Sequence, residues 1–165
     1  MTKTTPPLPL PKKPQIIEWK LIDANVVIHA KEGGEKAVIC QAVLQEANLA
    51  TSDIVEEEMI RLIGDICKYK LKIFKVPEIE KKLLDTWIGD REKQASIPDK
   101  SLIQAAINDL TIIGIVTYDK DFIHMSAKGY IDMADRRYNH KRNQFWVLNA
   151  EQYLIKTGRI RKGLK

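Results

Sequence analysis

The segment Ile112–Thr117, with the sequence IIGIVT, constrains the fold more than any other part of the chain. It is almost continuously apolar and β-branched, which is typical of a strand buried on both faces of a parallel sheet. Shorter strand-like runs are expected at residues 19–28, 49–51, 71–76 and 145–148. Apolar residues at helical spacing, with capping residues, predict helices over residues 35–48, 53–70, 78–93, 98–110 and 150–156. Strands that alternate with helices predict a three-layer α/β/α sandwich with a mostly parallel central sheet.

The chain of 165 residues divides into one expected domain and two tails. Residues 1–15 hold five of the seven prolines and are expected to form a flexible tail. The domain is expected over residues 16–157, with residues 122–143 as an irregular basic insertion, and residues 158–165 form a basic tail. No apolar stretch approaches the ~20 residues of a membrane span, and no signal peptide is visible. Because Cys40 and Cys67 have no paired spacing, we expect reduced thiols in a cytoplasmic protein.

Charge is distributed unevenly along the chain, although its formal net value is only +5. Residues 21–127 carry 13 basic and 18 acidic residues, whereas residues 128–165 carry 10 basic and three acidic ones. An acidic body beside a basic C-terminal third fits a metal-binding acidic centre next to a surface that binds a polyanion. Basic termini that merely aid solubility explain the same distribution.

Several carboxylates fall at the ends of the expected elements. Asp23 follows the apolar pair Leu21-Ile22, Asp119 and Asp121 follow the buried strand IIGIVT, and Asp99 lies in the first turn of the helix before that strand. In open α/β folds ligands bind beyond the carboxyl ends of the strands, so these side chains are expected near one another. Each also has an ordinary structural explanation as a turn former or a helix cap.

The run Glu56-Glu57-Glu58 adds a further carboxylate, whose identity depends on helical phase. At about 100° per residue, the apolar residues that begin with Val55 and Met59 define a buried face. Glu57 then points into solvent, whereas Glu58 reaches the edge of the core. Phase alone leaves Glu56 open as an alternative.

Clustered carboxylates repel one another and ionise together only when a cation joins them. Oxygen ligands suit Mg²⁺ or Mn²⁺, whereas a zinc site would use Cys or His, and the three histidines have no paired spacing. Such ions promote the in-line hydrolysis of phosphodiesters.

In chain order, the segments LIDANVVI, TSDIVEEEM, IPDKSLIQAA and VTYDKDF resemble the four acidic motifs of the PIN-domain nucleases. This family includes VapC-type toxins and RNA-processing endonucleases. The resemblance covers about residues 19–156 and is most specific at the first and fourth motifs. It implies a metal-dependent endoribonuclease that leaves 5′-phosphate and 3′-hydroxyl ends.

Carried over by position, the resemblance implies a catalytic and metal-binding quartet of Asp23, Glu58, Asp99 and Asp119, with Asp121 as a further metal ligand. The family has an apolar residue after its Glu, which Glu58 before Met59 fits. Asn25 and Thr117 are then expected to orient the carboxylates or a water. An RNA substrate, an antitoxin or other protein partner and a homodimer are implied partners. Residues 122–143 are longer and more basic than the connection expected in compact toxins.

Basic and aromatic residues interleave after the fourth motif, which suggests contacts with phosphates and unpaired bases. The basic residues expected to bind nucleic acid at the rim of the acidic site are Arg136, Arg137, Lys141 and Arg142. The aromatic residues of this block are Tyr130, Tyr138, Phe145 and Trp146, of which Trp146 is expected in the core.

Two alternatives to an endoribonuclease remain open. The first is a structure-specific DNA nuclease, because related acidic folds cut flaps. The second is a catalytically silent module that binds nucleic acid through its basic segments, although such a module has no use for mutually repelling carboxylates.

Overall fold

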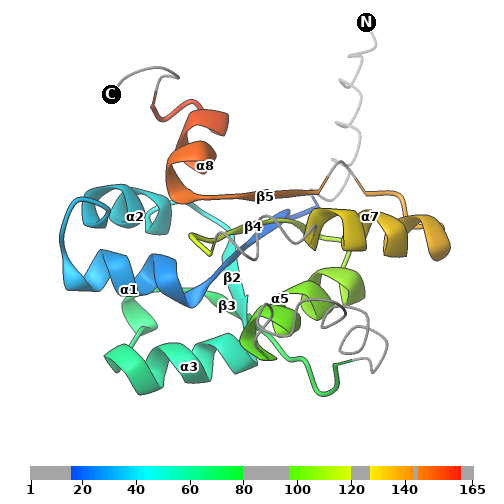
Figure 1. Ribbon diagram of the computed structural model, residues 1–165, viewed down its shortest axis with the longest axis horizontal. Helices are drawn as coiled ribbons and strands as arrows, with labels where there is room; N and C mark the ends of the chain where they lie inside the picture. The colour runs from blue at the N-terminus through cyan, green and yellow to red at the C-terminus, as the bar shows by residue number, and fades with distance from the viewer. Residues whose placement is uncertain (1–15, 80–96, 120–126, 143–144, 161–165) are drawn as a thin grey trace, which may run out of the picture.

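The computed structural model describes residues 16–79, 97–119, 127–142 and 145–160. Five parallel strands form one sheet in the order β3-β2-β1-β4-β5 (Figure 1). The strands are β1 (Trp19–Ile22), β2 (Leu49–Ser52), β3 (Lys72–Phe74), β4 (Ile112–Val116) and β5 (Trp146–Leu148). Since all strands are parallel, their carboxyl ends meet at one edge of the sheet.

Six α-helices and one 3₁₀ helix flank this sheet within the described residues. They are α1 (Ala24–Glu32), α2 (Ala37–Leu44), α3 (Asp53–Ile63), η1 (Cys67–Tyr69), α5 (Ile97–Asn108), α7 (Ala127–Arg137) and α8 (Ala150–Lys156). The architecture is the predicted three-layer α/β/α sandwich. None of the described helices is long and apolar enough to cross a membrane.

The core lies on both sides of β1 and β4. Both strands carry fully buried side chains, which are Leu21 and Ile22 in β1 and Ile115 and Val116 in β4. The burial of the β4 residues agrees with the prediction from the run IIGIVT. Gly114 of β4 is paired in register with Trp146 of β5. A methyl group built on Gly114 would collide with the Trp146 indole, so the glycine provides the space for that ring.

The first strand is shorter than the sequence predicted, because residues 24–32 form a helix rather than a continuation of the strand. The side chain of Asp23 accepts a hydrogen bond from the amide of Ala24 at 2.7 Å and so caps α1. The β-branched Val26 and Val27 favour a strand by propensity, but here they are buried on the helix. A local cap and tertiary packing outweigh that propensity.

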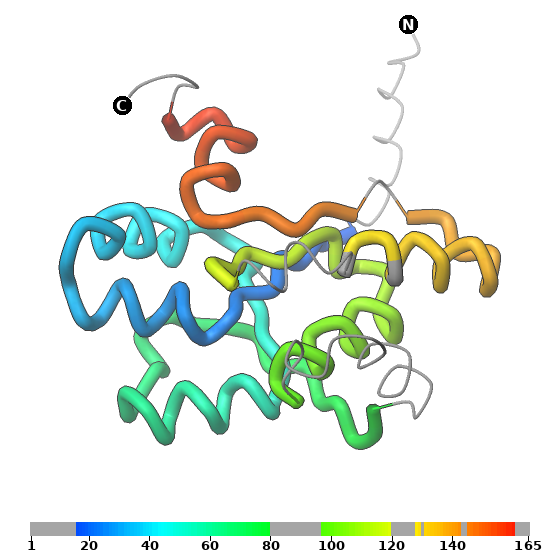
Figure 2. Tube along the Cα trace, in the orientation of Figure 1, coloured from blue at the N-terminus to red at the C-terminus, as the bar shows by residue number. Residues whose placement is uncertain are grey.

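The expected irregular insertion at residues 122–143 contains a three-turn helix, α7, which packs against α5. Along the tube trace in Figure 2, α7 runs from the middle of the molecule toward its right-hand side. The tail 1–15, residues 80–93 of the predicted helix over 78–93 and residues 161–165 of the predicted tail over 158–165 lie outside the described residues.

Candidate acidic site

Hydrogen bonds join neighbouring strands at the carboxyl edge of the sheet. The amide of Asp23, the residue after β1, donates a hydrogen bond to the carbonyl of Val116, the last residue of β4, at 3.0 Å. The hydroxyl of Thr51 in β2 donates to the carbonyl of Ile22 at 2.9 Å. The edge is therefore a fixed platform formed by the ends of β2, β1 and β4.

Asp23 lies at the centre of this platform and is only 4% exposed. Its Oδ2 accepts a hydrogen bond from the Thr117 hydroxyl at 2.6 Å and one from the Asn25 amide at 3.3 Å. The Thr117 oxygen in turn accepts the backbone amide of Asp119 at 3.0 Å. The Asn25 carbonyl oxygen accepts the amide of Tyr118 at 3.1 Å. Thr117 and Asn25, predicted to orient the carboxylates, thus tie Asp23 to the segment that carries Asp119.

The electrostatic environment of Asp23 links it to two further predicted residues. The pKa of Asp23 is raised to about 6, mainly by burial and to a smaller extent by the charges of Glu58 and Asp119. Hydrogen bonds from Thr117 and Ala24 oppose the shift because they stabilise the carboxylate. The charges of Glu58 in α3 and Asp119 after β4 therefore act on the same buried carboxyl group.

The three glutamates of α3 differ in their surroundings. Glu57 is exposed, whereas Glu56 and Glu58 are partly buried. Glu58 acts on Asp23, but Glu56 acts on Cys67, beyond the end of α3. This arrangement agrees with the helical phase argument and favours Glu58 over both neighbours.

Asp99 is brought to the same edge by a link between α5 and β2. Asp99 lies in the first turn of α5 and is 7% exposed. Two residues later, the Ser101 hydroxyl donates to the carbonyl of Pro98 at 2.6 Å and lies 2.6 Å from the Ser52 hydroxyl. Since Ser101 has only one proton to donate, Ser52 donates to Ser101. The Ser52 oxygen also caps α3 by accepting the amide of Val55.

The site includes residues that the sequence patterns did not single out. No sequence motif predicts the contact between the Ser52 and Ser101 side chains. Lys100, next to Asp99, is 2% exposed although a helical lysine normally reaches solvent. Tyr118, between Thr117 and Asp119, lies edge-on to His29 at 5.4 Å, and the Lys36 ammonium lies 4.6 Å from its ring centre.

The donor set at this edge consists of carboxylate, hydroxyl and amide oxygens, which suits Mg²⁺ or Mn²⁺. Burial and, to a smaller extent, the charges of Glu58 and Asp119 raise the pKa of Asp23, and a bound cation would oppose both effects. Within the described residues, no three His, Cys, Asp or Glu side chains are already grouped closely enough to hold a metal. Asp121, the predicted fifth ligand, lies outside the described residues.

The basic residues predicted at the rim of this site lie elsewhere, and that prediction is wrong in its location. Arg136 and Arg137 form the last turn of α7, and Lys141 follows it. The next residue, Arg142, donates to the carbonyl of Ile112, the first residue of β4, at 2.9 Å. The basic segment therefore lies at the amino edge of the sheet, opposite the acidic site, because α7 carries the chain back along the length of β4.

Arg142 does not fit its predicted role as a phosphate contact. Its side chain is 1% exposed and forms an ion pair with Asp135 at 2.9 Å. Its guanidinium also lies 5.5 Å from the ring centre of Phe145. Arg142 therefore holds the end of α7 against β4 and is not accessible to nucleic acid.

Comparisons of this chain with models of protein families, with curated proteins and with solved structures found no match.

Proposed function

We propose that the chain is a metal-dependent endoribonuclease, and that Asp23, Glu58, Asp99 and Asp119 form its acidic centre. The observation that carries the proposal is the buried Asp23 carboxyl group, which Thr117 holds at 2.6 Å and on which the charges of Glu58 and Asp119 act. A fold that gains nothing from such a site would avoid burying a carboxylate close to two other acidic groups. The motif resemblance to PIN-domain nucleases supports the same chemistry.

In this proposal the four carboxylates bind one or more Mg²⁺ or Mn²⁺ ions. Such an ion, when bound, stabilises negative charge on a phosphodiester and makes water a better nucleophile. Thr117 and Asn25 fix the Asp23 carboxylate, so its oxygens need little rearrangement to bind a cation. Thr117 also fixes the start of the segment that carries Asp119. The unpaired thiols of Cys40 and Cys67 are in keeping with a cytoplasmic enzyme.

The proposal is tested by incubating the protein with single-stranded RNA, duplex RNA, single-stranded DNA and flap DNA, with Mg²⁺, Mn²⁺ or EDTA. We expect cleavage of RNA that requires metal and falls by about 100-fold or more in Asp23→Asn, Glu58→Gln and Asp99→Asn. Glu57→Gln is the matched control, because Glu57 is exposed on the same helix and should keep full activity.

Three outcomes contradict the proposal. Cleavage that persists in EDTA and in Asp23→Asn does not arise from a metal bound at the acidic centre. A clear preference for flap DNA favours a structure-specific DNA nuclease. If the protein binds nucleic acid without cleaving it, and the affinity does not depend on metal, the chain is a catalytically silent binding module.

A further inference from the structure

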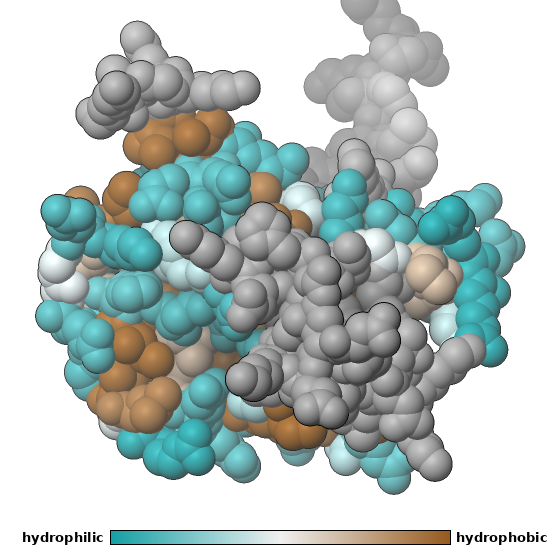
Figure 3. Space-filling view, in the orientation of Figure 1, coloured by the Kyte–Doolittle hydropathy of each residue, from teal (hydrophilic) through white to brown (hydrophobic). Residues whose placement is uncertain are grey.

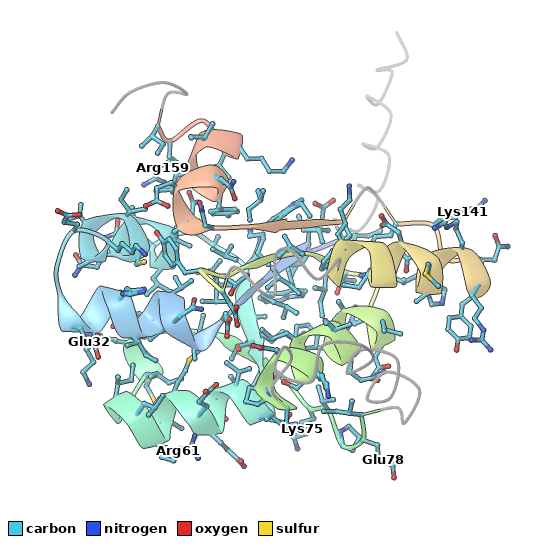
Figure 4. The ribbon with its side chains drawn as sticks, in the orientation of Figure 1. Glu32, Arg61, Lys75, Glu78, Lys141 and Arg159 are labelled. Atoms are coloured by element: carbon cyan, nitrogen blue, oxygen red, sulfur yellow. The ribbon has the colours of Figure 1, made fainter. Side chains whose placement is uncertain are left out.

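A group of exposed basic residues lies at the amino edge of the sheet, at the far end of β4 from the acidic site. We define the basic patch as Arg136, Arg137, Tyr138 and Lys141, all of which are exposed. In Figure 4, Lys141 lies beyond the end of α7 and on the other side of the molecule from Arg61 in α3. The space-filling view shows mainly hydrophilic surface over this end of α7 (Figure 3).

The three cations of the basic patch are available to an external anion. The ion pairs among the described residues involve Asp135 with His140 and Arg142, and Glu46 with Arg159, but no residue of the patch. Of the two acidic side chains of α7, Asp135 is already paired with the buried Arg142, and Asp132 forms no ion pair with the patch within 4 Å. The positive charge of the patch is therefore not neutralised locally.

The basic patch is held rigidly although it lies on the surface. Arg142 ties it to the start of β4, and the amide of His140 donates to the carbonyl of Asp135 at 2.7 Å. The amide of Tyr138 donates to the carbonyl of Ala134 at 3.0 Å and extends the helical turn. Since these hydrogen bonds already hold the backbone of the patch, binding a ligand has to order only the exposed side chains.

An exposed aromatic ring among the cations indicates the class of ligand. Tyr138 is 50% exposed, and its ring centre lies 5.6 Å from that of His140. The Arg137 guanidinium lies 5.8 Å from the Tyr138 ring. Cations with an exposed ring suit single-stranded nucleic acid, whose phosphates need positive charge and whose unpaired bases stack on aromatic faces. A membrane surface or an acidic protein needs only the charge.

We infer that the basic patch is a second RNA-binding surface that anchors single-stranded RNA away from the acidic site, an inference that rests on the proposed nuclease function. The five residues of β4 separate the two sites by about 16 Å, at ~3.3 Å per residue. A short oligonucleotide bound at the acidic site does not span this distance, whereas a long one contacts both sites. The protein therefore prefers long RNA, and the patch contributes to binding rather than to the chemical step.

The first test measures RNA binding without cleavage. The full chain carrying Asp23→Asn is titrated into fluorescent single-stranded RNA of about 20 nucleotides, with and without Arg136→Gln, Arg137→Gln and Lys141→Gln. We expect the triple substitution to weaken binding about 10-fold or more at low salt and to reduce the slope of log affinity against log salt by about 2. Tyr138→Leu should weaken binding about 5-fold or more. A matched control replaces three exposed cations elsewhere, Arg61, Lys68 and Lys156, by Gln.

The second test separates this inference from the proposed function. In the protein with an intact acidic site, the patch substitutions should raise KM for the long RNA about 10-fold and leave kcat and the cleavage of a dinucleotide unchanged. Equal binding by the patch and control variants overturns the inference even if the protein is a nuclease. Patch-dependent binding to anionic lipid vesicles with unchanged RNA binding also overturns it. Patch-dependent RNA binding without any cleavage upholds the anchoring surface and rejects only the nuclease function.

Discussion

Asp23 serves both the fold and the proposed chemistry at the scale of a single residue. One carboxylate oxygen caps α1 and the other accepts hydrogen bonds from Thr117 and Asn25. Structurally, an asparagine would provide part of this capping without a buried charge. The retained carboxylate therefore costs stability at neutral pH, which is typical of residues kept for function.

The first prediction concerns the pH dependence of this cost. The pKa of Asp23 is raised to about 6 in the folded protein, against about 3.9 for an unfolded chain. Between these values the folded state binds more protons, so this group lowers the free energy of unfolding as pH rises from about 4 to about 6. Above pH 6 the cost stays at about 3 kcal/mol, because each tenfold change in proton affinity corresponds to about 1.4 kcal/mol.

Asp23→Asn should therefore raise the free energy of unfolding at pH 8 by up to about 3 kcal/mol, less about 1 kcal/mol for the altered hydrogen bonds. At pH 4 the gain should vanish, because the wild-type carboxyl group is then protonated. Urea unfolding at both pH values measures the difference, with Glu57→Gln as the exposed control. An equal effect at pH 4 and pH 8 would show that the charge of Asp23 is not the cause.

The second prediction concerns Thr117, which is fully buried between Asp23 and the amide of Asp119. Thr117→Val keeps the shape but removes the three hydrogen bonds of the hydroxyl, to Asp23, Asp119 and Asn25, and it should lower RNA cleavage about 10–100-fold. Since the Thr117 hydroxyl lowers the pKa of Asp23, Val should also move the pH midpoint of the stability change upward. Thr117→Ser, which keeps the hydroxyl, should retain both the rate of RNA cleavage and the pH midpoint of the wild-type protein. If Ser is as impaired as Val, the methyl packing and not the hydrogen bonds is responsible.

The sequence indicated most of the acidic residues because their positions follow from simple rules. Asp23 directly follows β1, Asp119 lies three residues after the last residue of β4, and Glu58 follows from helical phase. Ser52 is a helix cap of the predicted type, but its contact with Ser101 was not foreseen because it joins segments 49 residues apart, and the burial of Lys100 was not foreseen either. No local pattern encodes such contacts.

At the scale of secondary-structure elements, prediction succeeded where local signals and burial agree. The helix over residues 150–156 begins at Asn149, whose side chain forms a capping box with Gln152, and its bounds match α8. The sequence of residues 24–28 favours a strand because Val26, Val27 and Ile28 are β-branched, although the Asp23 cap starts a helix. The sequence of residues 127–137 suggests a loop because charged residues conceal the buried positions Ile131 and Ala134.

The third prediction tests how β4 and β5 pack. Gly114→Ala places a methyl group against the Trp146 indole, so the ring must move. We expect the free energy of unfolding to fall by about 1–3 kcal/mol, as for other overpacked cores. In the double variant with Trp146→Leu, the smaller side chain should remove most of the extra cost, which a double-mutant cycle measures. Additive effects of the two substitutions would mean that the glycine is needed for its backbone instead.

At the scale of the whole molecule, the two ends of the sheet differ in charge. The carboxyl edge carries Asp23 and Asp119 after their strands, with Glu58 of α3 acting on Asp23, whereas the amino edge carries the cations of the basic patch. The sequence alone suggested that the two lay side by side, because the basic residues follow Asp119 closely in the chain. The parallel sheet separates them, since a helix must return the chain to the starting edge before β5 begins.

The last prediction uses the stability of the whole molecule to detect metal binding without any assay of cleavage. A ligand that binds only the folded state stabilises it by about 2.7 kcal/mol at 100 times its Kd. For a domain of this size we therefore expect saturating Mg²⁺ or Mn²⁺ to raise Tm by about 5–10 °C, and EDTA to reverse the change.

Substitutions and changes of pH that alter this increase in Tm identify the site at which the metal binds. Asp23→Asn and Glu58→Gln should abolish most of the shift, whereas Glu57→Gln should keep it, because Glu57 faces solvent. The shift should also shrink as the pH falls below about 6, since Asp23 must lose its proton to bind a cation. A shift that survives both substitutions places the metal elsewhere. If neither ion raises Tm at pH 8, the acidic edge does not bind a metal, and the proposed chemistry fails at its first step.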